Sequence, residues 1–346
     1  MKRYSFLLFV IVLLTGCSQS EKFQITGAGA TFPYPLYSLM FQHFYQETGL
    51  EIEYDPIGSG AGIKRFLKRQ VDFGATDIAI TTAEAADVQE EIVQIPLCLG
   101  AVGISYNLPL AGTLQLTPEI IAAIFQGSIQ KWNDEQIMAS NSDLQLPDQE
   151  IRVIYRADAS GTTRIFSDFL SHNVQSWREQ IGKVEILSLP VGKSTKGNAG
   201  IAEELRRTPG GIAYLERIYA TQKGMPLASI QNIHGNFIAP TTESISESAR
   251  NLSELSNAVS LTGRESENGY PISSFSWIVL YREQAVGKTR LQANNTVRLI
   301  WWMLHDGQKY ARELDYSPLP LETIIHAEAL LKTITYQGDE LIGDKF

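Results

Sequence analysis

Hydrophobic positions along the chain alternate between strand-like and helix-like spacings from Ile25 onward. Compact apolar runs predict strands at residues 51–54, 71–75, 102–106 and 274–281. Apolar residues three and four apart predict helices that include residues 63–67, 120–125, 165–170 and 297–305. The periodic signal is weaker at 107–115, 140–150 and 239–270, and the last of these segments is rich in Ser, Thr, Glu and Asn. Because strands alternate with helices, we predict an α/β fold whose sheets are largely covered by helices.

The N-terminal residues follow a different pattern. Lys2 and Arg3 precede an unbroken apolar run, 6–14, which is too short to span a bilayer and is typical of a signal-peptide core. The run ends in Leu-Thr-Gly before Cys17, which resembles the bacterial lipoprotein signal. That resemblance implies a signal peptide at 1–16, a tether at 17–22, and a lipid on Cys17 that anchors the protein to a membrane. A plain signal peptide with an incidental cysteine is the alternative.

Composition narrows the function classes. The 346 residues are 44% hydrophobic and 19% charged, which is typical of a globular protein with room for two domains. The formal net charge is −9, and removal of residues 1–16 makes it −11. This acidity argues against a nucleic-acid partner, and any anion must be held by a local site. Cys98, the other cysteine, lies among aliphatic residues and is expected to be a core residue.

Three glycine-rich segments, 27–35, 58–62 and 158–162, each lead into a predicted helix. Each combines a hydroxyl side chain (Thr31, Ser59 or Ser160) with the unpaired N–H groups and positive dipole end of a helix. Any one of these hydroxyls alone is more simply explained as a helix cap. Three similar junctions together predict a shared oxyanion site that needs no net positive charge.

Two charged residues refine the predicted anion. Arg156 precedes the third junction, and its guanidinium can meet two anion oxygens at once. Asp77 follows the predicted strand at 71–75, where a carboxylate beside an anion is useful only if the ligand carries a proton. Phosphate is protonated at neutral pH and sulfate is not. The pair therefore favours phosphate as the ligand.

Seven segments support a family resemblance: TGAGATFP (26–33), GSGAG (58–62), VDFGATD (71–77), GSIQKWND (127–134), RADASGT (156–162), GNAGIA (197–202) and YARELDYSPLP (310–320). In this order the chain resembles the phosphate-binding protein of the ABC phosphate importer, from about residue 24 to 325. The resemblance implies phosphate ligands at Thr31, Phe32 (through its backbone N–H), Ser59, Asp77, Arg156, Ser160, Gly161 and Thr162. It also implies that Asp158 holds Arg156 in place. Ala159 and the Gly60-Ala61 pair depart from the family pattern, and a positive φ at either alanine would be strained.

The same resemblance implies a two-lobed periplasmic-binding-protein-like fold with a ligand cleft between the lobes. Lobe 1 is expected at 23–99 and 268–346, and lobe 2 at 100–267. The expected function is high-affinity binding of inorganic phosphate outside the cytoplasmic membrane and its delivery to the permease subunits of an ABC transporter, by a monomer, without turnover and without a cofactor.

Three alternatives remain open from the sequence. A binding protein for sulfate, molybdate or tungstate is disfavoured by Asp77. A secreted phosphatase or esterase that uses Ser59 or Ser160 is disfavoured because no histidine can be assigned as its base, and the five histidines show no metal-ligand spacing. A lipoprotein that senses phosphate for signalling would use the same binding site.

Overall fold

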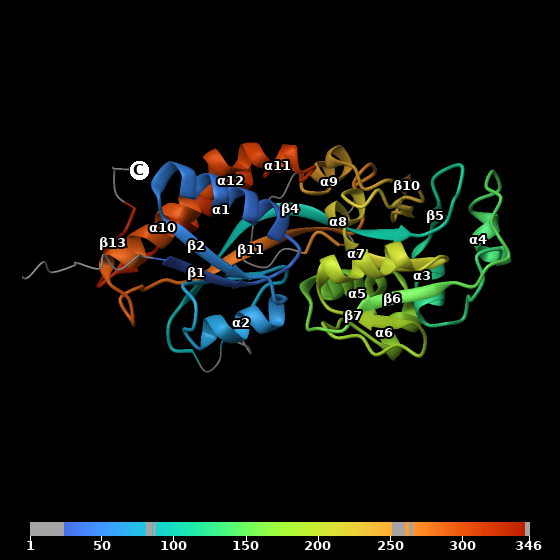
Figure 1. The fold of residues 1–346 in the computed structure, drawn as a ribbon, viewed down its shortest axis with the longest axis horizontal. Coiled ribbons are helices and arrows are strands. Elements are labelled where there is room, and N and C mark those ends of the chain that lie inside the picture. Colours follow the sequence, from blue (N-terminus) through green and yellow to red (C-terminus); the bar gives the residue numbers. More distant parts are fainter. Residues whose placement is uncertain (1–23, 81–84, 86–87, 251–259, 263–265, 343–346) are drawn as a thin grey trace, which may run out of the picture.

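The computed structural model describes residues 24–80, 85, 88–250, 260–262 and 266–342. An eight-stranded sheet in the order β2-β1-β3-β11-β4-β8-β6-β7 runs along its length (Figure 1). Its strands are β1 (Gln24–Gly29), β2 (Glu51–Asp55), β3 (Phe73–Thr76), β4 (Ile92–Tyr106), β6 (Arg152–Arg156), β7 (Lys193–Thr195), β8 (Gly211–Glu216) and β11 (Ser273–Tyr281). The smaller strands are β5 (Gln115–Leu116), β9 (Ser229–Gln231), β10 (Phe237–Ile238), β12 (Thr335–Tyr336) and β13 (Asp339–Glu340). The predicted mixed α/β class is confirmed.

Strand β4 connects the two halves of this sheet. Its residues 92–101 pair antiparallel with β11, and its residues 102–106 pair antiparallel with β8. The prediction of a strand only at 102–106 was therefore too short. Residues 93–106 are all buried, including the polar Gln94 and Ser105, so the run lacks the alternation of buried and exposed positions that marks a half-exposed strand. The expected lobe boundary at 99/100 falls inside β4, and the exact division into lobes stays a prediction.

Helices cover both faces of the sheet on either side of β4. On the side of β1 and β2 they are α1 (Tyr34–Thr48), α2 (Ser59–Leu67), α10 (Arg290–Leu304), α11 (Lys309–Glu313) and α12 (Leu321–Lys332), with a short 3-10 turn at Asp306–Gln308. On the side of β6 and β8 they are α3 (Pro118–Phe125), α4 (Glu135–Ala139), α5 (Gly161–Asn173), α6 (Gln175–Gln180), α7 (Gly197–Arg207), α8 (Arg217–Thr221) and α9 (Thr242–Ser248). We call these two groups of elements lobe 1 and lobe 2 (Figure 1).

Helix α9 lies in the segment 239–270, where the periodic signal in the sequence is weak. The segment is rich in residues that favour caps over helix interiors, and this composition obscured the helix. Thr241 accepts a hydrogen bond from the backbone N–H of Ser244, and the Ser244 hydroxyl accepts one from the N–H of Thr241. This reciprocal capping box satisfies two N–H groups that the first turn would otherwise leave unpaired.

The buried core includes Cys98, as expected from its aliphatic neighbours in the sequence. Trp302 is buried edge-on against Phe44, with ring centroids 5.5 Å apart, whereas Trp301 is only half-buried. Across the described ranges, we find no helix with the length and apolar character that a bilayer crossing requires. The predicted signal peptide, the predicted tether and Cys17 lie outside the described residues.

Candidate functional site

Two of the three glycine-rich segments run directly into the first turn of a helix, whereas in the segment 27–35 a loop separates β1 from α1. Helix α2 begins at Ser59, four residues earlier than the predicted start at Ile63, and α5 begins at Gly161 with Ser160 as its N-cap. Small residues make the early start of α2 possible, because a Cβ on Gly62 would lie 2.1 Å from the Cα of Gly29 in β1. The helix N-termini are thereby brought directly against the carboxyl ends of the strands.

The two lobes meet where α2 and α5 begin. A Cβ on Gly161 would lie 2.5 Å from Ser59 Oγ and 2.6 Å from Asp77 Oδ2, so only glycine permits this approach. The backbone N–H of Gly60 also donates to the carbonyl of Ala159 across the seam, at 3.3 Å. The structure therefore holds the lobes in a closed arrangement, with Ser59 and Asp77 of lobe 1 facing the start of α5.

Asp77 is a buried carboxylate directly after β3, with 2% of its surface exposed. Its Oδ1 accepts from the Ser276 hydroxyl at 2.8 Å, and its Oδ2 accepts from the Ser59 hydroxyl at 3.3 Å. Burial raises the pKa of Asp77 to about 7, and this outweighs the lowering by Ser276, by the Arg156 charge and by Ser59. Close to neutral pH the group can therefore both accept and release a proton.

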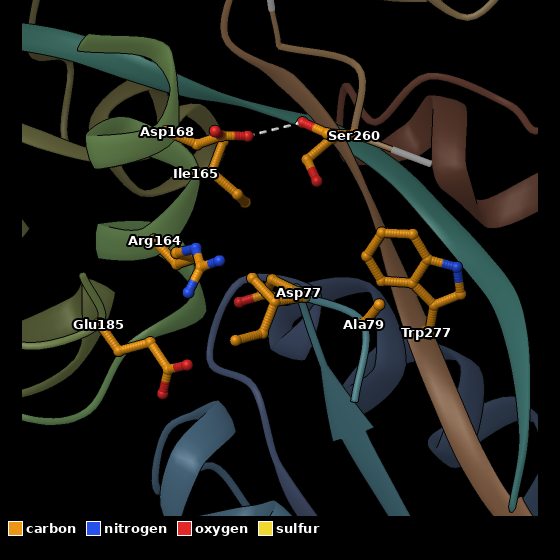
Figure 2. A pocket seen from close by; sticks show the side chains of 10 residues that line it. Asp77, Ala79, Arg164, Ile165, Asp168, Glu185, Ser260 and Trp277 are labelled. Carbon is orange, nitrogen blue, oxygen red and sulfur yellow. Dashed lines mark hydrogen bonds between the residues drawn. The ribbon is translucent and has the colours of Figure 1, made fainter. Parts of the chain in front are cut away.

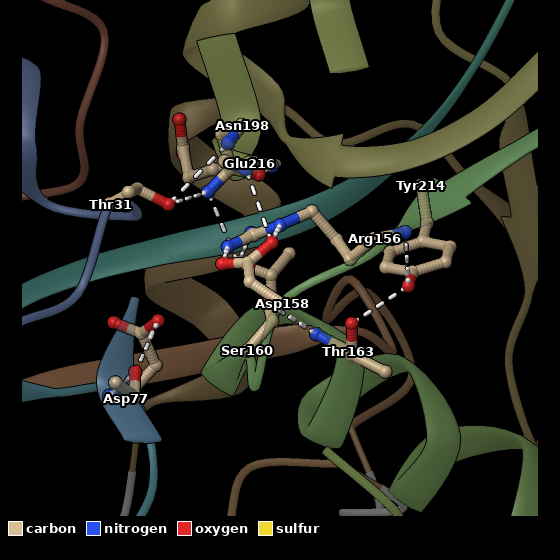
Figure 3. Close-up of polar contacts among 12 residues, drawn as sticks. Thr31, Asp77, Arg156, Asp158, Ser160, Thr163, Asn198, Tyr214 and Glu216 are labelled. Carbon is tan, nitrogen blue, oxygen red and sulfur yellow. Dashed lines mark hydrogen bonds and ion pairs between the residues drawn. The ribbon is translucent and has the colours of Figure 1, made fainter. Parts of the chain in front are cut away.

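Arg156 ends β6, and its guanidinium pairs with the Asp158 carboxylate (Figure 3). Arg156 Nε donates to Asp158 Oδ1 at 2.8 Å, and Arg156 Nη2 donates to Asp158 Oδ2. Burial acts to raise the pKa of Asp158, but the hydrogen bonds and charge of Arg156 bring it below its ordinary value. Nη1 donates to the Thr162 hydroxyl at 3.4 Å. A guanidinium has five N–H groups, and among the described residues one N–H on each terminal nitrogen has no acceptor and is left for a ligand.

Thr31 reaches the same site from lobe 1 but does not cap a helix. The N-cap of α1 is Pro33, which makes no side-chain capping bond, so the capping explanation fails for Thr31. It holds for Ser160, whose hydroxyl accepts from the N–H of Thr163 at 3.1 Å. The Thr31 hydroxyl instead accepts from the side-chain amide of Asn198 in lobe 2, at 3.0 Å.

Three tyrosine hydroxyls hold the loop that carries Thr31 and Phe32. Tyr54 donates to the carbonyl of Ala30 at 2.8 Å, and Tyr219 donates to the carbonyl of Thr31 at 2.5 Å. Tyr316 donates to the carbonyl of Phe32 at 2.7 Å. Among the described residues, none accepts from the N–H of Phe32. The tyrosines thus fix the peptide planes and leave this N–H for a ligand.

Two cavities border the site on the seam between the lobes. One, of about 350 Å³, lies beside Asp77 and is lined by side chains from α5 and β11, including Arg164, Asp168 and Trp277 (Figure 2). The other, of about 380 Å³, is more apolar and lies beside Ser59. Arg156 lies in neither lining and is 1% exposed, so the guanidinium is the enclosed end of the site.

Comparisons with known proteins identify the family of the chain. A family model described as a PBP superfamily domain matches residues 17–293. Phosphate-binding protein PstS of Pasteurella multocida is 34% identical over 338 residues, which cover 96% of this chain and 97% of the relative. The protein of the same name from Haemophilus influenzae is 36% identical over 314 residues, which cover 89% and 92%. The chain belongs to the PstS family of phosphate-binding proteins.

Solved structures place the PstS-family chain in the same fold. A high affinity periplasmic phosphate-binding protein (PfluDING), solved with bound phosphate, aligns with a TM-score of 0.70 at 20% identity and covers 88% of this chain and 93% of its own. A phosphate-binding protein from Stenotrophomonas maltophilia aligns with a TM-score of 0.68 at 19% identity, with the same coverage. The periplasmic-binding-protein-like architecture predicted from the sequence is confirmed.

The structure also settles the two departures from the family pattern. Neither Ala61 nor Ala159 has a positive φ, so the alanines cause no backbone strain. Sequence reasoning missed Asn198, although the segment 197–202 was among the matching segments. It also missed the three tyrosines, whose positions in the chain carry no common spacing. Their shared role depends on contacts between residues 24 to 284 positions apart.

Proposed function

We propose that this PstS-family protein binds inorganic phosphate between its lobes, outside the cytoplasmic membrane, and delivers it to an ABC permease without chemical turnover. The observation that carries the proposal is the convergence, across one seam, of two helix starts, one guanidinium and one buried carboxylate. The proposed ligands are Thr31, Phe32 (through its N–H), Ser59, Asp77, Arg156, Ser160, Gly161 and Thr162, with Asp158 supporting Arg156.

The balance of donors and acceptors favours phosphate. Helix N–H groups, hydroxyls and the free guanidinium N–H groups donate to anion oxygens, and the Arg156–Asp158 pair adds no net charge. Asp77 is the acceptor, and it requires a ligand that brings a hydrogen. Phosphate does so at neutral pH, whereas sulfate would leave a buried carboxylate facing an anion without a hydrogen bond.

Calorimetric titration of the purified protein with phosphate tests the binding function. We expect phosphate, and its protonated analogue arsenate, to bind, and equimolar sulfate to leave the phosphate titration unchanged. Incubation with a chromogenic phosphate monoester should release no product. Absence of phosphate binding, equal binding of sulfate, or turnover of the ester would each contradict the proposal.

We further propose that a lipid on Cys17 anchors the protein and that phosphate enters when the lobes open about β4 and β11. The lobes would be 23–99 with 268–346, and 100–267, and the protein would act as a monomer. The Leu-Thr-Gly-Cys sequence after an apolar run supports the anchor. Cys17→Ala should release the protein from the membrane fraction while its phosphate affinity stays unchanged. A variant that remains in that fraction would refute the lipid anchor.

A further inference from the structure

Asn198 lies at the start of α7 and is fully buried between the lobes. Its Oδ1 accepts from the backbone N–H of Glu216 at 2.9 Å. A backbone N–H can only donate, so this bond fixes which end of the amide is oxygen. The Nδ2 group must therefore point the other way, toward the hydroxyl of Thr31 (Figure 3). It also donates to the hydroxyl of Thr162.

The contacts at these two hydroxyls use up their capacity to accept. Thr31 Oγ1 accepts from Asn198 Nδ2 at 3.0 Å and from the Asn198 backbone N–H at 3.4 Å. Thr162 Oγ1 accepts from Asn198 Nδ2 at 3.1 Å and from Arg156 Nη1 at 3.4 Å. A hydroxyl has two lone pairs and one hydrogen. Each hydroxyl is therefore left with only its hydrogen.

No acceptor within the described part of the chain takes either hydrogen. Both side chains lie in the set proposed to hold phosphate, and they come from opposite lobes. An anion between them would accept two hydrogen bonds from groups whose hydrogens are already directed. Hydrogen bonds to a charged group are stronger than neutral ones, and a preset donor loses less rotational freedom when the ligand arrives.

We infer that Asn198 is a positioning residue that turns the hydroxyl hydrogens of Thr31 and Thr162 toward the bound oxyanion. It acts on the ligand only through these two hydroxyls. The inference rests on the proposed function, since it deepens the account of the same site. It also explains why the lobes close on each other here, because one amide reaches a hydroxyl of each lobe.

Double-mutant cycles with phosphate affinity as the readout test this role. Asn198→Ala should weaken phosphate binding by about 10- to 100-fold, because the hydroxyls are then free to rotate and to bond elsewhere. Thr31→Val and Thr162→Val should each weaken phosphate binding by a similar factor. Since Asn198 acts through these hydroxyls, the fold-loss of phosphate affinity in each double variant should be distinctly smaller than the product of the fold-losses in its two single variants.

Asn141→Ala is the matched control. Asn141 is also buried, with Nδ2 bonds to the carbonyls of Gln115 and Ile137 and an Oδ1 bond from the N–H of Gln115, all 2.8 Å. The Asn141→Ala exchange should lower the melting temperature of the protein but leave its phosphate affinity unchanged. If the wild-type protein binds phosphate, either of two results would overturn the inference: fold-losses of phosphate affinity that multiply fully in both cycles, or an unchanged phosphate affinity in Asn198→Ala. Failure of the wild-type protein to bind phosphate would instead overturn the proposed function, and this inference with it.

Discussion

The exchange Asp77→Asn probes how the proposed site tells phosphate from sulfate. The amide has nearly the shape of the carboxylate, but it replaces one acceptor oxygen with a donor. If its oxygen keeps the 2.8 Å bond from Ser276, its NH₂ takes the position of Oδ2, which faces Ser59 and Gly161. A sulfate oxygen can accept from this NH₂, and no buried charge is left facing the anion.

The size of the effect follows from the cost of that unpaired charge. A site built around a required hydrogen bond can reject an analogue that lacks it by about 10⁴- to 10⁵-fold. In Asp77→Asn we expect the ratio of sulfate to phosphate dissociation constants to fall by at least about 100-fold, equivalent to about 2.7 kcal/mol. Calorimetric titrations with both anions at pH 8 measure the ratio. Burial raises the pKa of Asp77 to about 7, which is still below pH 8, so Asp77 is charged in most of the ligand-free protein at this pH.

Asp72→Asn is the matched control. Asp72 lies five residues before Asp77 but bonds to Thr26 and Lys288 away from the seam, so its variant should keep wild-type selectivity. In the wild-type protein, discrimination should also narrow as the pH falls from 8 to 5.5, because a protonated Asp77 can donate to sulfate. An Asp77→Asn protein with the wild-type ratio would refute the carboxylate's role in selectivity.

Three further perturbations test the site and its buried charges. Arg156→Ala should weaken phosphate binding by about 10²-fold or more in calorimetry, since it removes a buried charged donor; an unchanged affinity would contradict its role. Gly161→Ala places a Cβ 2.5 Å from Ser59 Oγ and should prevent the lobes from approaching each other here. Phosphate affinity should therefore fall, and small-angle scattering should show a particle larger than the wild-type protein even in excess phosphate. A variant as compact as the wild-type protein would argue against closure at this position. Burial raises the pKa of Glu216 to about 8, so the folded state retains a proton that the unfolded state releases above about pH 4.5. The free energy of unfolding should therefore fall from pH 5 to pH 8, by at most about 1.4 kcal/mol per pH unit from this group, and Glu216→Gln should flatten that slope in chemical denaturation. An unaltered slope would refute the assignment.

Local sequence was sufficient where one segment carries the chemistry. The segment 156–162 supplies a guanidinium, the carboxylate that holds it and a helix start, all within seven positions. Asp77 follows a strand that is buried throughout, so its placement at a strand end was predictable from the pattern. The same patterns gave the fold class, because strands and helices alternate along most of the chain.

Sequence could not supply contacts that exist only after the lobes assemble. Asn198 meets Thr31 across 167 positions, and Tyr316 meets Phe32 across 284. A buried asparagine or tyrosine in an apolar context has many possible partners, and no local spacing selects among them. The first part of strand β4, residues 92–101, was not predicted for a related reason. Burial on both faces removes the alternation of apolar and polar residues by which a half-exposed strand is recognised.

These tertiary contacts explain how an acidic protein could present the proposed anion site. The formal charge of the chain is −9, the Arg156–Asp158 pair is neutral, and Asp77 adds a further carboxylate. Attraction by net charge therefore cannot hold the ligand. The proposed site instead offers a fixed set of directed hydrogens. They come from the helix starts, from the loop whose carbonyls accept from three tyrosines, and from the Thr31 and Thr162 hydroxyls, whose lone pairs are occupied by Asn198 and Arg156. Since such donors are already oriented and dehydrated, their dipoles act at full strength on a small anion, and a single acceptor is enough to require that this anion carry a hydrogen.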